Sequence, residues 1–245
     1  MRTIEKMQIP AENVAIVSGI GCSSRAAGYL NFQTLHTTHG RALAFATGLK
    51  MVRPELTIFV LMGDGDSTAI GGNHFIHTAR RNIDVNAIIF NNQIYGMTGG
   101  QASPLTPQGK KGSTAPFGCT ERNFDIMKLA MGAGATFAAR STTYHLKLLD
   151  KMIEEGVNNK GFSIVEAMTY CPTGFGRQNK SGSAAAMLNW YKDHAVPVEK
   201  AAVSDAKTVK ERITIGIHHQ EQEAEFVSEY EKIIESQRQK SGGSS

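Results

Sequence analysis

Two apolar runs separated by one helix-length segment constrain the fold of this chain more than any other feature. Residues 57–62 and 85–90 are almost wholly apolar, which is typical of strands that a parallel sheet buries on both faces. The segment at residues 71–81 is a helix candidate. In a strand-helix-strand unit both strands end at the same edge of the sheet, and ligands of open α/β proteins bind at that edge.

The residues that follow the two runs have the chemistry of a cation site. The first run leads into Gly63-Asp64-Gly65 and the second into Asn91-Asn92. Mg²⁺ binds carboxylate and carbonyl oxygens and leaves other positions to phosphates. Asp64, the amide of Asn92 and the main-chain carbonyl of Ile94 are therefore candidate ligands of a magnesium diphosphate. On spacing alone, the two motifs fit a tight turn and a strand end equally well.

The segments around these motifs resemble one protein family. They are GIGCSSR (19–25), LHTTHGRALAFATGLK (35–50), GDGDSTAIGGNHFIHTARRN (63–82) and NNQIYGMTGGQASPLTP (91–107). They resemble the thiamine diphosphate-binding β subunits of 2-oxoacid:ferredoxin oxidoreductases, and within that family the 2-oxoglutarate enzymes most of all. The likeness extends from about Val14 to the region of Tyr230.

Strand and helix candidates alternate along most of the chain. The strand candidates are residues 14–18, 57–62, 85–90, 136–139 and 162–167, and the helix candidates between them are 38–51, 71–81, 124–131 and 143–155. This alternation predicts an α/β fold with a mostly parallel sheet and helices on both faces. The resemblance implies the diphosphate-binding type of thiamine diphosphate fold.

We divide the chain into three parts. Residues 1–169 are expected to form the thiamine diphosphate- and magnesium-binding domain. Residues 170–238 are expected to form a C-terminal extension with a loop near an iron-sulfur cluster and a terminal helix, and residues 239–245 a flexible tail. Within the first part, residues 96–120 are rich in Gly, Pro, Ser and Thr, and a loop of this length is usually functional.

The resemblance also implies which residues contact thiamine diphosphate. Backbone amides in the two glycine turns would face the phosphates, and the GIGC turn and the HTTHG segment would supply further contacts. The expected cofactor-binding residues are Ile20, Gly21, Cys22, Ser23, His39, Gly65, Asp66, Gly96, Met97 and Thr98. His39 is in addition the candidate catalytic residue, although a histidine near a helix start, such as His36 or His39, is often a cap. His74 and His77 are interpreted as structural because no third metal ligand accompanies them.

The three cysteines, Cys22, Cys119 and Cys171, are odd in number and widely spaced, which argues against a disulfide framework. Each is compatible with a small buried side chain. The resemblance implies that Cys22 and Cys171 are two of four thiolates that hold a [4Fe-4S] cluster, and leaves Cys119 structural. The family's upstream Cys-x-x-Cys pair does not occur in this sequence. We therefore expect either an upstream coding sequence that supplies it or a subunit without the cluster.

The thiamine diphosphate reaction also requires a group that activates the cofactor and a group that binds the substrate. The resemblance implies that a glutamate from a separate pyrimidine-binding domain activates the cofactor through proton transfer, and a chain of this size has no room for a second such domain. We expect a larger α subunit to supply it, so that the chain alone is inactive. Arg25, in the GIGCSSR turn, is a candidate for binding the distal carboxylate of 2-oxoglutarate, although an arginine in a turn is usually solvated.

Composition excludes other classes of protein. The net charge of +4 is too small to indicate a nucleic-acid-binding protein, and no apolar stretch approaches the roughly 20 residues of a membrane span. We expect a cytoplasmic β subunit of 2-oxoglutarate:ferredoxin oxidoreductase, which forms succinyl-CoA from coenzyme A and passes electrons to ferredoxin, or runs in reverse. The alternatives are a pyruvate or other 2-oxoacid enzyme, a truncated subunit without electron transfer, and a non-catalytic nucleotide-binding module.

Overall fold

The centre of the molecule is an eight-stranded sheet, which the computed structural model shows within the residues it describes, 2–201 and 212–242. The strands lie in the order β2-β1-β3-β4-β6-β5-β8-β7. Their bounds are β1 Val14–Ser18, β2 Gln33–His36, β3 Thr57–Gly63, β4 Asn86–Asn91, β5 Phe137–Thr142, β6 Ser163–Met168, β7 Ala195–Pro197 and β8 Ile213–Gln220.

All strand pairs from β2 across to β5 are parallel, whereas β8 pairs antiparallel with β5. In the register of β3 with β4, Gly63 lies opposite Phe90. The residues that follow these two positions, Asp64 and Asn91-Asn92, therefore leave adjacent strands at the same level of the sheet.

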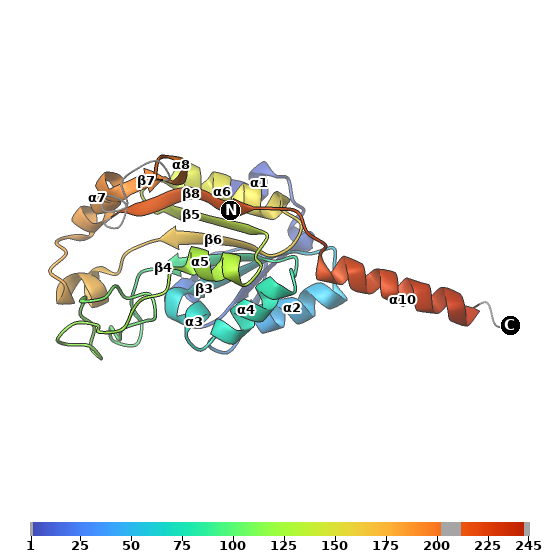
Figure 1. Ribbon diagram of the computed structural model, residues 1–245, viewed down its shortest axis with the longest axis horizontal. Helices are drawn as coiled ribbons and strands as arrows, with labels where there is room; N and C mark the ends of the chain where they lie inside the picture. The colour runs from blue at the N-terminus through green and yellow to red at the C-terminus, as the bar shows by residue number, and fades with distance from the viewer. Residues whose placement is uncertain (1, 202–211, 243–245) are drawn as a thin grey trace.

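Helices cover both faces of the sheet (Figure 1). In that view α2, α3, α4 and α5 lie on one side, and α1 and α6 lie on the other. The helix bounds are α1 Arg2–Lys6, α2 Ala42–Val52, α3 Asp64–Thr68, α4 Gly72–Arg80, α5 Ile126–Gly132, α6 Leu146–Asn158, α7 Ala184–His194, α8 Val198–Ala201 and α10 Phe226–Gly242, with two 3₁₀ turns, η1 Ala11–Asn13 and η2 Ser23–Tyr29, and one π-helical turn, η3 Pro172–Gly176.

The side chains of β3 show why an almost wholly apolar run becomes a central strand. Ile58, Val60 and Met62 pack into the core on the α2 and α4 side, and Phe59 and Leu61 pack into the core on the α6 side. Because successive strand residues point to opposite faces, both sets must be apolar when helices cover both faces. The predicted fold class is confirmed.

The structure differs from the sequence-based expectations at three places. The helix expected from residue 38 begins at Ala42, because Gly40 has a φ of 71° that no right-handed helix accepts. The motif at Asp64 is the first turn of α3 instead of a tight turn. Strands β2, β7 and β8 were not expected. All four residues of β2 are exposed and β7 ends in Pro197, so neither has the apolar pattern of an inner strand.

The C-terminal part adds to the same sheet and then leaves it. Strand β8 hydrogen-bonds to β5, and α10 projects away from the body (Figure 1). Helix α10 runs to Gly242 and so includes the first residues of the segment expected as a tail, whereas residues 243–245 lie outside the described residues. No helix among the described residues has the length and apolarity needed to cross a membrane.

Candidate functional site

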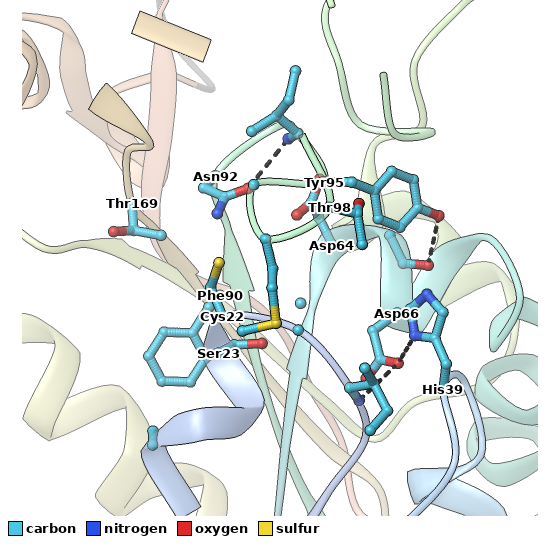
Figure 2. A pocket seen from close by; sticks show the side chains of 18 of the residues that line it. Cys22, Ser23, His39, Asp64, Asp66, Phe90, Asn92, Tyr95, Thr98 and Thr169 are labelled. Atoms are coloured by element: carbon cyan, nitrogen blue, oxygen red, sulfur yellow. Dashed lines mark hydrogen bonds and ion pairs between the residues drawn. The ribbon is translucent and has the colours of Figure 1, made fainter. Parts of the chain in front are cut away.

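A cavity of about 320 Å³ opens at the carboxyl ends of β1, β3 and β4 (Figure 2). All but two of the sequence-predicted site residues line it. They are Ile20, Gly21, Cys22, Ser23, His39, Asp64, Gly65, Asp66, Asn92, Ile94, Gly96, Met97 and Thr98. Arg25 and Cys171 do not line it.

Asp64 lines the cavity directly after β3, and the residue is 2% exposed. The Ser103 hydroxyl and backbone N–H groups, including that of Asn92, donate hydrogen bonds to its carboxylate. Burial nevertheless dominates and raises the pKa of Asp64 to about 7. A cation bound to this carboxylate would offset the unfavourable burial of its charge.

Asn92 and Ile94 lie beside Asp64 on the turn that follows β4. This turn reverses at Gln93, which has a φ of 63°. The Ile94 N–H donates to the side-chain oxygen of Asn92 at 3.2 Å, as Figure 2 shows. The structure therefore brings the three predicted magnesium ligands to one cavity. The side-chain oxygen of Asn92 also accepts the hydrogen bond from Ile94 within the turn.

A second buried carboxylate, Asp66, contacts the candidate catalytic residue. His39 Nδ1 lies 2.5 Å from Asp66 Oδ1, and the N–H groups of Gly40 and Ile20 donate to the same oxygen at 2.7 and 3.4 Å. Because a carboxylate only accepts, His39 donates through Nδ1. The other oxygen, Asp66 Oδ2, is buried and has no hydrogen-bond partner among the described residues.

The sequence analysis assigned only the backbone amide of Asp66 to the cofactor and missed this side-chain contact. The signal was present in the second acidic residue of the GDGD motif, but its link to His39 depends on how the turn after β1 packs. An added Cβ at Gly19 would collide with the Asp66 carboxylate, so only glycine allows that approach.

The loop at residues 96–120, in which the described structure contains no helix or strand, closes part of the site. The hydroxyl of Ser103 in this loop donates to Asp64. Tyr95, just before the loop, packs its ring on Gly65, and its hydroxyl donates to the Gly65 carbonyl at 3.2 Å. Thr98 donates to Gln101 Oε1 at 2.7 Å. Sequence reasoning missed Tyr95 and Ser103, because no local pattern marks which loop residue folds back onto a strand end.

Cys22 and Cys171 lie near each other beside Gly96. An added Cβ at Gly96 would be 3.4 Å from Cys22 Sγ and 3.2 Å from Cys171 Sγ. Burial raises the pKa of Cys22, and the neighbouring Cys171 adds to this effect. Burial also raises the pKa of Cys171, but hydrogen bonds from Thr173 and from the backbone N–H groups of η3 outweigh it and lower the pKa overall. Among the described residues, no group of three His, Cys, Asp or Glu side chains could hold a metal ion.

Arg25 lies on η2, whose first residue lines the cavity, but its guanidinium points elsewhere. It lies over the ring of Tyr29, with 5.4 Å between Arg25 Cζ and the ring centroid. Tyr29 is 78% exposed, so this contact is at the surface. The structure does not bring Arg25 together with the other predicted site residues.

A buried charge network supports the turn that carries Asn92. Asn91 accepts from the Gln93 N–H at 3.0 Å and donates to Glu166 Oε1 at 2.6 Å. The other oxygen, Glu166 Oε2, accepts from Arg140 Nε at 2.5 Å, and Arg140 Nη2 donates to Asp125 at 2.9 Å. Glu166 on β6 and Arg140 on β5 therefore hold the turn in place, and neither residue lines the cavity.

Comparisons with known proteins identify what this arrangement is similar to. The family model described as "Thiamine pyrophosphate enzyme, C-terminal TPP binding domain" matches residues 19–167. The 2-oxoglutarate synthase subunit KorB of Methanocaldococcus jannaschii is 48% identical over 235 residues, which cover 96% of this chain and 87% of the relative. The KorB subunit of Methanothermobacter thermautotrophicus is 50% identical over 213 residues, which cover 87% and 74%.

A solved structure shows the same arrangement of the chain. It is described as 2-oxoglutarate:ferredoxin oxidoreductase from Magnetococcus marinus with 2-oxoglutarate, coenzyme A and succinyl-CoA bound. The TM-score is 0.85 at 30% sequence identity, and the match covers 96% of this chain and 81% of that chain.

Proposed function

Because the chain belongs to the β subunits of the 2-oxoacid:ferredoxin oxidoreductases, a family of thiamine pyrophosphate enzymes, we propose that it is the cofactor-binding subunit of a 2-oxoglutarate:ferredoxin oxidoreductase. The reaction is the oxidative decarboxylation of 2-oxoglutarate to succinyl-CoA, or the reverse carboxylation. One observation carries the assignment to this cavity. The buried Asp64 carboxylate, with a pKa raised to about 7, lies beside Asn92 and has no cationic partner among the described residues.

The donor set fits a magnesium diphosphate better than a protein-only metal site. Asp64, Asn92 and the Ile94 carbonyl offer oxygen ligands, and the described residues contain no larger cluster of acidic or histidine side chains. Mg²⁺ commonly takes one or two carboxylates and fills its other positions with phosphate and water. Backbone N–H groups of Gly65 and Asp66, and of Gly96 and Met97, would face the phosphates, together with the Thr98 hydroxyl.

When bound, thiamine diphosphate would supply a nucleophilic carbon for the 2-oxo group and a ring that serves as the electron sink for decarboxylation. The residues of this chain would hold and orient the reacting groups. His39, fixed through Nδ1 by Asp66, would contact the cofactor or a reaction intermediate from the wall of the cavity. Arg25 would bind the distal carboxylate of 2-oxoglutarate after turning away from Tyr29.

The chain depends on a partner for the remaining parts of the site. Among the described residues that line the cavity there is no glutamate to activate the pyrimidine ring. We infer that a larger α subunit supplies it at a shared interface. Cys22 and Cys171 would provide two of the four thiolates of a [4Fe-4S] cluster. Ferredoxin is the proposed electron acceptor, magnesium the proposed metal, and the cytoplasm the proposed location.

The test is reconstitution. The chain should show no turnover alone with thiamine diphosphate and Mg²⁺, and the complex with its α subunit should reduce methyl viologen only when 2-oxoglutarate, coenzyme A and both cofactors are present. Turnover by the isolated chain would refute the partner requirement. A complex that prefers pyruvate would favour the alternative enzyme, which the position of Arg25 outside the cavity leaves as the second candidate.

A further inference from the structure

Four cations on two neighbouring segments form what we call the basic face: Lys110 and Lys111 from the loop after β4, and Arg177 and Lys180 from the segment after η3. All four side chains are exposed. None of them takes part in an ion pair within the part of the chain that the structure describes. The two acidic residues between β4 and α5 do not neutralise them, because Glu121 is followed by another cation, Arg122, and Asp125 pairs with Arg140.

Hydrogen bonds hold the two segments of the basic face together. The Lys111 N–H donates to Asn179 Oδ1 at 2.8 Å, and Asn179 Nδ2 donates to the Lys111 carbonyl and to the Phe175 carbonyl at 3.0 Å each. Gln178 Nε2 donates to the Gly100 carbonyl at 3.3 Å. The charges are therefore carried on a fixed backbone, and Figure 1 shows the two segments at the same end of the molecule.

The basic face adjoins the turn that carries Cys171. The Gly174 N–H donates to Cys171 Sγ at 3.2 Å. An added Cβ at Gly174 would be 3.5 Å from the Cα of Gly100, which belongs to the same loop as the lysines. A molecule bound to the basic face would thus lie next to the turn that carries Cys171.

One aromatic side chain, that of Phe117, is exposed on the same loop as Lys110 and Lys111. Phe117 is 99% exposed. It lies on a hairpin whose arms are joined by the Gly109 N–H to Cys119 carbonyl bond and the Cys119 N–H to Lys110 carbonyl bond, both 2.8 Å. An exposed aromatic anchor surrounded by basic groups is a pattern of transient, charge-steered protein interfaces.

We propose that the basic face, with Phe117 as its anchor, is the docking surface for the electron acceptor, a small acidic one-electron carrier of the ferredoxin type. The inference rests on the proposed function. The cations of the basic face have no ion-pair partner within the described chain, and they lie beside the turn of Cys171, one of the two proposed cluster ligands. Two other occupants fit less well. Lysine is depleted in the cores of permanent subunit interfaces, and a fully exposed Phe117 offers no cleft for the adenine of coenzyme A.

The experiment uses the assembled αβ complex and a purified acidic two-cluster ferredoxin. The double variant Lys110→Glu/Lys111→Glu should weaken ferredoxin binding by about tenfold or more at low salt and flatten its dependence on salt, because rim charges act mainly on association. Phe117→Ala should weaken binding by about tenfold at all salt concentrations, as loss of an aromatic anchor does. Biolayer interferometry without substrate gives both results independently of turnover.

The matched control is Lys147→Glu/Lys151→Glu on α6, which makes the same charge change at exposed positions on another face. It should bind ferredoxin within twofold of the unchanged complex. Viologen reduction should be unaffected in all variants, and its failure in the unchanged complex would instead contradict the proposed function. The docking proposal is overturned if the Lys110/Lys111 variant binds ferredoxin normally, if it fails to assemble with the α subunit, or if only its KM for coenzyme A rises.

Discussion

Two groups of buried charge lie close together in this sheet, and they differ in how completely they are paired. In the cavity, Asp64 and Asp66 are each 2% exposed, and the one basic side chain that contacts either of them within the described residues is His39, beside Asp66. Behind the cavity, Glu166 is 1% exposed and pairs with Arg140, which also pairs with Asp125.

The difference appears in the pKa shifts of the two groups. Burial raises the pKa of Asp64 to about 7, because nothing cationic offsets the loss of water. Burial alone would lower the pKa of Arg140, but Glu166 and Asp125 raise it overall. In the paired network, protein side chains neutralise one another without a ligand, so the network supports the fold. The unpaired carboxylate in the cavity is neutralised only when a cationic ligand binds. The contrast separates ligand-binding residues from supporting residues in one sheet.

The largest effect is expected from Asp64→Asn. The variant keeps the shape but removes the metal-binding charge, so cofactor-dependent activity of the complex should fall by at least about 10³-fold, more than the 10–100-fold typical of residues that only support a metal ligand. Thermal unfolding of the chain without cofactor should stay the same or shift upward, because a poorly compensated buried carboxylate is removed. Calorimetric titration with Mg²⁺ and thiamine diphosphate measures the loss of binding.

The control for this variant is Asp84→Asn. Asp84 is paired with Lys50 at 2.8 Å and Lys160 at 2.9 Å, so its replacement should reduce stability and leave cofactor affinity unchanged. If Asp64→Asn instead destabilised the chain and still bound the cofactors, the interpretation of Asp64 as an uncompensated ligand would be wrong.

The next effect is expected from Glu166→Gln, which tests the paired group. Glutamine can still accept from Asn91, but it leaves Arg140 with one carboxylate in place of two. The free energy of unfolding should fall by roughly 3 kcal/mol, at the low end for breaking a buried pair because Asp125 remains. Urea unfolding measures this loss. Loss of cofactor affinity with unchanged stability would show that Glu166 belongs to the ligand site and is not a support.

The same contrast shows what could be predicted from the sequence. That Asp64 and Asn92 share one rim follows from two apolar runs and the rule that parallel strands end together, so local pattern suffices. The pairing of Arg140 with Glu166 joins strands whose order the sequence does not reveal. Strand β8 returns antiparallel to β5 with alternating polar residues that resemble a surface segment. The orientation of Arg25 depends on one side-chain rotamer over Tyr29, which no sequence pattern specifies.

A smaller effect is expected from Asp66→Asn, which tests whether Asp66 acts through His39. The variant retains an acceptor near His39 Nδ1 but no longer fixes which nitrogen carries the proton, so kcat should fall by about tenfold with little change in thiamine diphosphate affinity. Nitrogen NMR shifts of His39 should change from one tautomer to a mixture. In a double-mutant cycle, His39→Gln should add little to Asp66→Asn, because both remove the same interaction. Additive losses would show that the two residues act separately.

The smallest effect is expected from Arg25→Ala, because this charge is neither buried nor paired with a carboxylate. Its contact with Tyr29 is at the surface, so stability should change by less than about 0.5 kcal/mol. The ratio of kcat/KM for 2-oxoglutarate to that for pyruvate should fall by about tenfold in the complex, since pyruvate lacks the distal carboxylate that a guanidinium binds. Arg25→Lys should recover part of this preference, because it keeps the charge but not the two-pronged geometry. If the ratio is unchanged in both variants, Arg25 does not bind the substrate and keeps its contact with Tyr29. The residues that select the 2-oxoacid would then belong to the α subunit.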